Sequence, residues 1–96
     1  MIYTVSFFGH RKITDSIEVE KQVDKLVREL IRTKEYVEFL VGRNGDFDLM
    51  TASVVRRLKK ELNAENVFLT LVLPYETAEL RNNTEAFENF YDSIEI

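Results

Sequence analysis

Short apolar segments alternate along this chain with longer segments whose apolar residues recur every third or fourth position. Ile2–Phe8, Tyr36–Val41 and Val67–Leu73 are rich in β-branched and aromatic residues, and the last is a nearly continuous apolar run that stops at Pro74. The two segments between them have helical periodicity. Strands that alternate with helices form right-handed βαβ units and a parallel sheet. The pattern therefore predicts an α/β fold.

Both helical segments have recognisable ends. Asp15 and Glu18 stand in capping-box register before a helix of about four turns. The second helix follows a glycine-bearing turn, has Asp46 or Asp48 as its candidate N-cap, and is expected to end near Asn63.

The last quarter of the chain predicts shorter elements. Residues 75–83 are polar and are expected to form a loop, Thr84 is a candidate cap for a short helix, and 93–96 indicates a fourth extended segment. The simplest arrangement is a single domain over residues 1–96. We expect a three-layer Rossmann-like domain, with a mostly parallel sheet of about four strands in the order 2-1-3-4 and helices on both faces.

Composition excludes several classes of protein. The 96 residues are 45% hydrophobic and include no cysteine, which excludes disulfides and thiolate metal sites and fits a cytoplasmic protein. The net charge of −4 argues against a surface that coats nucleic acid. No apolar run approaches the roughly 20 residues needed to span a bilayer. We expect a cytoplasmic protein without a membrane partner.

Gly9, His10 and Arg11 follow the first predicted strand directly. Ligands of open α/β sheets bind beyond the carboxyl ends of the strands, where a glycine lets backbone N–H groups approach an anion. Arg11 can add a charge-assisted contact, and His10 can donate a hydrogen bond or stack on a base or sugar. Each residue also has an ordinary structural role: a turn glycine, a solvated histidine and an arginine paired with an acidic neighbour such as Asp15.

A second glycine-bearing turn follows the second predicted strand and leads into a helix. If the first two strands are parallel neighbours, the two turns face each other, and their helix N-termini form a cradle for phosphate or diphosphate. The acidic residues of the second turn repel phosphate and suit ribose hydroxyls, an amino group or a cation. Asp48 as a helix cap and Phe47 as a core plug are the structural alternatives. The candidate residues of this turn are Gly42, Arg43, Asn44, Gly45, Asp46, Phe47 and Asp48.

Three motifs in this order resemble the SLOG superfamily, the SMF/DprA-LOG Rossmann-like domains, and in particular its YpsA-like branch. The motifs are Phe8-Gly9-His10-Arg11, then residues 39–48, then Leu71-Val72-Leu73-Pro74-Tyr75. The resemblance spans nearly the whole chain and implies a Rossmann-like fold that binds nucleotides or nucleotide-derived ligands. The ligand contacts that it implies are Gly9, His10 and Arg11, then Gly42, Gly45, Phe47 and Asp48, and finally Pro74 and Tyr75 at the rim of the third strand.

The sequence departs from this superfamily in two respects. The Pro-Gly-Gly-x-Gly-Thr loop of the phosphoribohydrolase branch has no counterpart, so that enzymatic activity is not supported. Members also continue through further strands, which implies a shortened member or a fragment.

The sequence predicts binding or sensing of a nucleotide-derived small molecule, with no cofactor, no metal and no catalytic residue assigned. One alternative is a hydrolase of nucleotide N-glycosidic bonds with Asp48 as its acidic group. The other is an interaction module that forms a homodimer, because a short fourth strand leaves an edge that a second copy could pair with. Phe87, Phe90 and Tyr91 are expected to be packing residues, with a dimer contact as their alternative role.

Overall fold

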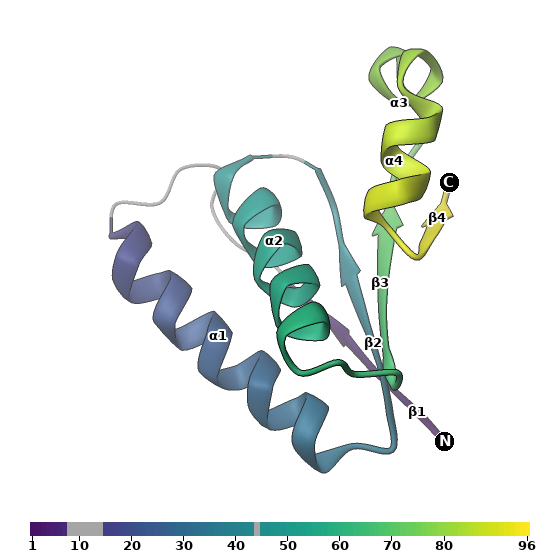
Figure 1. Cartoon of the computed structure of the whole chain (residues 1–96). Coiled ribbons are helices and arrows are strands. Elements are labelled where there is room, and N and C mark those ends of the chain that lie inside the picture. The colour runs from purple at the N-terminus through teal and green to yellow at the C-terminus, as the bar shows by residue number, and fades with distance from the viewer. Residues whose placement is uncertain (8–14, 44) are drawn as a thin grey trace.

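Four parallel strands and four helices make up the part of the chain that the computed structural model describes, residues 1–7, 15–43 and 45–96 (Figure 1). The second strand has the predicted bounds, and the other strands differ from prediction by one or two residues at their ends. Residues 75–83, predicted to be a loop, contain a short helix capped by Thr77, whose hydroxyl accepts from the Leu80 N–H at 3.1 Å. The elements are β1 (Ile2–Ser6), α1 (Ser16–Thr33), β2 (Tyr36–Val41), α2 (Asp46–Glu61), β3 (Val67–Val72), α3 (Ala78–Asn82), α4 (Thr84–Phe90) and β4 (Ser93–Glu95).

The strand order is β1-β2-β3-β4, so the predicted order 2-1-3-4 is wrong. All three pairings are parallel, and Phe39 of β2 lies between Val5 of β1 and Leu69 of β3. The reason lies in the side chains of β1. Thr4 and Ser6 alternate with apolar residues and are exposed, as befits a strand at the edge, whereas β3 is almost entirely apolar and lies inside the sheet.

The sequential strand order also determines the number of layers. Right-handed crossovers that always move to the next strand in one direction place every connecting helix on the same face of the sheet. Figure 1 shows α1, α2 and α4 on one side of the strands. The described residues therefore form two layers, and the prediction of helices on both faces is wrong.

One continuous core lies between the helices and the covered face of the sheet. Val37, Phe39 and Val41 alternate along β2 and are buried, because every second residue of a strand points to the same face. Helix α1 contributes Val23, Val27 and Ile31, which recur every fourth residue along one side of the helix. The remaining buried hydrophobic residues are Ala52, Val54, Val55, Leu58, Val67, Leu69, Leu71, Leu73, Leu80, Phe87 and Tyr91.

The opposite face of the sheet carries no helix within the described part of the chain. Thr70 on this face is fully buried, and its hydroxyl donates to the Glu38 carboxylate on the neighbouring strand at 2.9 Å. Larger side chains around this pair are exposed to solvent, namely Ile2, Tyr36, Phe68 and Val72.

Asp92 attaches β4 to β3 by hydrogen bonds. Its backbone N–H donates to the Leu69 carbonyl at 2.8 Å, and its carboxylate accepts from the Leu69 N–H at 2.7 Å. The Lys59 ammonium on α2 donates to the same carboxylate at 3.0 Å. A strand of only three residues is thus held by a charged anchor at its start.

Helices α1 and α2 are joined by a cluster of charged side chains around Asp24. The Asp24 carboxylate accepts from Arg57 of α2 at 2.8 Å and from Arg28 at 3.2 Å. Burial opposes ionisation of Asp24, but the hydrogen bonds from Arg57 and Arg28 outweigh it and hold the pKa below its usual value of 3.8. The ionised carboxylate therefore stabilises the folded chain.

We expect the stability that Asp24 contributes to be present above about pH 4 and lost as the pH falls through its lowered folded-state pKa. Asp24→Asn should lower the free energy of unfolding at pH 7 by about 1 kcal/mol, the upper range for a partly exposed ion pair. Urea denaturation of both proteins at pH 7 and pH 3 tests this, with exposed Glu20→Gln as the control. An unchanged difference between wild type and Asp24→Asn across that range would contradict it.

Candidate functional site

The carboxyl ends of β1 and β2 lie side by side at one edge of the sheet. Ser6 pairs with Leu40, and the Phe7 N–H donates to the Leu40 carbonyl at 3.4 Å. The predicted adjacency of the first two strands is therefore confirmed. Gly9, His10 and Arg11, the predicted first ligand loop, lie outside the described residues, and their position opposite the second turn stays a prediction.

Gly45 makes the turn from β2 into α2. Its φ of 143° and ψ of −171° lie in a region that is essentially restricted to glycine. Gly45 is the N-cap residue, and its carbonyl accepts from the Leu49 N–H at 3.2 Å. The predicted caps, Asp46 and Asp48, instead occupy the first turn of the helix, where carboxylates interact favourably with the helix dipole.

Asp48 folds back toward the preceding strand. A Cβ atom added at Gly42 would lie 3.1 Å from the Asp48 Oδ2 atom, so the carboxylate packs closely against the backbone of the turn. The absence of a side chain at Gly42 thus permits the close approach. The predicted role of Asp48 as a ligand contact stays a prediction, and Asn44 between the two glycines lies outside the described residues.

Phe47 packs against the core. Its ring centroid lies 6.4 Å from that of Phe7, which in turn stacks on Phe39 with centroids 5.8 Å apart. This arrangement is the core plug that the sequence offered as the structural role of Phe47. The three rings tie the end of β1 and the start of α2 to the buried centre of β2.

Arg43 extends toward α3 and α4. Its Nε donates to the Glu79 carboxylate, its Nη1 donates to the Tyr91 hydroxyl at 3.4 Å, and its guanidinium lies 4.7 Å from the Phe87 ring centroid. Burial disfavours the charged form, but the bonds to Glu79 and Tyr91 outweigh this and raise the pKa of Arg43. Arg43, which the sequence grouped with the other residues of the turn, thus bonds to two residues outside the turn.

Pro74 and Tyr75 follow β3 and are exposed, with Tyr75 at 66%. Because β2 lies between β1 and β3, this rim flanks the β2–α2 turn on the side away from the end of β1. The Leu73 N–H, just before the rim, donates to the Glu95 carbonyl at 2.9 Å and fixes the end of β3.

Two polar features of α2 could not be assigned from the sequence. Thr51 is fully buried, and its hydroxyl has no hydrogen-bond partner within the described ranges. Ser53, two residues further on, is exposed and lines a cavity that faces α4. Among residues 1–7, 15–43 and 45–96, no three His, Asp or Glu side chains form a cluster that could hold a metal ion.

Comparison with known proteins adds no family assignment: no family model matches the chain, and neither the curated proteins nor the solved structures give a match. The structure therefore supports a small α/β domain with a four-stranded parallel sheet, and the SLOG resemblance is not confirmed. Within the described part of the chain, no helix is long and apolar enough to cross a membrane.

We expect Gly45→Ala to lower the free energy of unfolding by about 1–3 kcal/mol, because a Cβ atom is strained at this φ and ψ. Gly42→Ala is the matched control: among the described residues, its new methyl meets the carboxylate of the flexible Asp48 side chain. We expect that control to change stability by about 0.5 kcal/mol or less. Urea denaturation measures both, and equal losses would show that the turn geometry is wrong.

Proposed function

We propose that this chain binds a nucleotide-derived ligand at the carboxyl edge of the sheet, above the β2–α2 turn. The observation that supports this most strongly is the parallel pairing of β1 and β2, which places Ser6 and Phe7 at the end of β1 beside Leu40 at the end of β2. The carboxyl edge of an open parallel sheet is where such folds bind ligands. The resemblance of Gly9-His10-Arg11 to a ligand loop adds to this.

The charges at the turn favour a ribose-bearing phosphate over a bare anion. The first amides of α2, a helix of 16 residues, lack intrahelical acceptors and lie at the positive end of the helix dipole. Asp46 and Asp48 in the same turn repel a phosphate but can accept hydrogen bonds from ribose hydroxyls. The ligand therefore needs a phosphate for the amides and Arg11, and a sugar for the carboxylates.

Isothermal titration with ADP-ribose, NAD, nucleoside monophosphates, cyclic dinucleotides and inorganic phosphate tests the proposal. We expect saturable heat with at least one of the nucleotides and much weaker binding of inorganic phosphate. Arg11→Ala should abolish nucleotide binding and leave the melting temperature nearly unchanged. Asp48→Asn should weaken nucleotide binding and strengthen phosphate binding, because it removes a sugar contact and a repulsive charge.

Arg81→Ala serves as the control, because Arg81 is exposed on α3. No heat from any nucleotide, with the protein folded, would refute the proposal. Equal losses in Arg11→Ala and Arg81→Ala would refute the assignment of Arg11.

A specific observation also supports the alternative that the chain forms a homodimer. It favours pairing through β1, whereas the sequence suggested the edge at the fourth strand. β4 has three residues and carries Glu95, whereas β1 has five residues without charge or proline. Short, charged edge strands resist pairing with another chain, and uncharged ones permit it. Because the Phe7 N–H points to β2, the N–H groups of Ile2, Thr4 and Ser6 point away from the sheet.

An antiparallel pair of β1 strands would join two copies about a twofold axis. We expect sedimentation equilibrium to show concentration-dependent dimers that Thr4→Pro abolishes, because the substitution removes an outward N–H and leaves the β1–β2 ladder intact. Val5→Pro, whose N–H points to β2, is the control and should destabilise the fold. A monomer at all concentrations, or dimers that persist in folded Thr4→Pro, would refute pairing through β1.

A further inference from the structure

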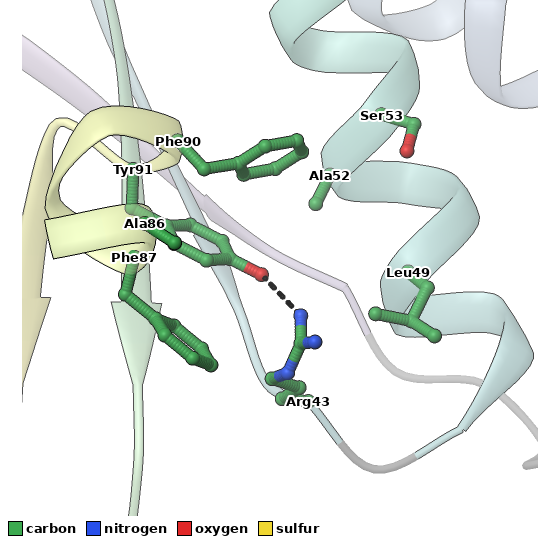
Figure 2. Close-up of a pocket in the computed structure, with 8 residues that line it drawn as sticks. All are labelled: Arg43, Leu49, Ala52, Ser53, Ala86, Phe87, Phe90 and Tyr91. Carbon is green, nitrogen blue, oxygen red and sulfur yellow. Dashed lines mark hydrogen bonds between the residues drawn. The ribbon is translucent and has the colours of Figure 1, made fainter. Parts of the chain in front are cut away.

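A cavity of about 310 Å³ lies between α2 and α4 on the covered side of the sheet. Figure 2 shows side chains from the two helices facing each other across it, with Arg43 at one end. Its walls are Leu49, Ala52 and Ser53 of α2, and Ala86, Phe87, Phe90 and Tyr91 around α4. The volume falls at the small end of the range found for ligand sites, which is about 300–1,000 Å³.

The spacing of small and large residues creates the space. Leu49, Ala52 and Ser53 are three and four residues apart, so they share one side of α2, and two of them are small. On the facing side, Phe87 and Tyr91 stack with ring centroids 6.1 Å apart, and Phe90 meets Tyr91 edge to face at 4.9 Å. The aromatic rings pack against one another, and the small residues of α2 leave the cavity open.

The guanidinium of Arg43 determines which kind of ligand the cavity can bind. The Arg43 side chain is 33% exposed, and its planar group is positioned by the Tyr91 hydroxyl and the face of Phe87. A guanidinium has five N–H donors in a fork that matches a carboxylate, and the bonds to Glu79 and Tyr91 use two of them. The positioned cation at the end of an apolar chamber suits a ligand with one carboxylate and a compact apolar body.

Glu79 pairs with Arg43, so the carboxylate of a ligand has to replace the Glu79 carboxylate. Its side chain is 56% exposed, so it can leave Arg43 for solvent at small cost. A ligand that brings its own carboxylate also fills the apolar chamber, which Glu79 does not do. Exchange of Glu79 for the ligand therefore keeps Arg43 paired and adds the burial of apolar surface.

We propose that the α2–α4 cavity binds a small aryl or alkyl carboxylate, with the carboxylate on Arg43 and the apolar body between Ala52 and the aromatic residues of α4. The site is separate from the nucleotide site proposed at the carboxyl edge of the sheet and does not depend on it. It requires no phosphate and uses neither Arg11 nor Asp48. A second cation, Arg56, lies 4.6 Å from the outer ring Phe90 and is the competing anchor.

NMR titration with 3-phenylpropionate, with neutral 3-phenylpropionamide as its matched comparator, tests the assignment. We expect the methyl signals of Leu49, Ala52 and Ala86 to shift and saturate with a Kd of about 0.1–1 mM, as small ligands of this size do. The amide should bind at least about tenfold more weakly, because a hydrogen bond to a charged partner is lost. Glu79→Gln should tighten carboxylate binding by up to about fivefold, which corresponds to an exposed ion pair.

Two variants separate binding from folding. Arg43→Gln should remove the preference for carboxylate over amide, and Ala86→Leu, at an exposed position, should fill the cavity and abolish binding of both probes without loss of fold. Arg81→Gln is the control, because Arg81 on α3 is exposed and also pairs with a glutamate, Glu76, at 3.9 Å. Absence of saturable shifts at the cavity would overturn the proposal. Equal affinity for acid and amide, or loss of carboxylate binding in Arg56→Gln rather than Arg43→Gln, would overturn the assignment of Arg43.

Discussion

The pairing of β2 with β3 is the constraint on which the rest of the structure depends. Phe39 and Leu69 are paired across these strands, and both are buried beneath the helices. The rows of apolar side chains that contain these two residues form the surface against which α1 and α2 pack. The Asp24 cluster then joins the two helices to each other, and Asp92 attaches β4 to the outer side of β3.

The local elements were predictable because their signals are local. Asp15 accepts from the Glu18 N–H at 3.2 Å, as the capping-box register predicted, and the Tyr36–Val41 strand has the bounds that its apolar run indicated. The strand order was not predictable from the same signals, because it depends on contacts between residues far apart in sequence. The polar alternation of Thr4 and Ser6 was the one available sign that the first strand belongs at an edge.

The candidate site likewise combines local features that the sequence predicted with long-range contacts that it did not. Gly42 and Gly45 indicated a turn after the second strand, and the structure places a φ of 143° at Gly45. The direction of Arg43 depends on Glu79 and Tyr91, which are 36 and 48 residues away in sequence. No spacing rule links such residues, so the sequence grouped Arg43 with its neighbours at the turn, and the cavity between α2 and α4 was missed.

The fold and the candidate site both depend on β2 lying between β1 and β3, because this order places α1, α2 and α4 on one face and brings the ends of β1 and β2 together. Nuclear Overhauser effects between backbone protons of adjacent strands measure the order directly. We predict contacts between the backbones of Val5 and Phe39 and between those of Phe39 and Leu69, which are paired in the sheet. Backbone contacts between Val5 and Leu69, with none between Phe39 and Leu69, would contradict the account.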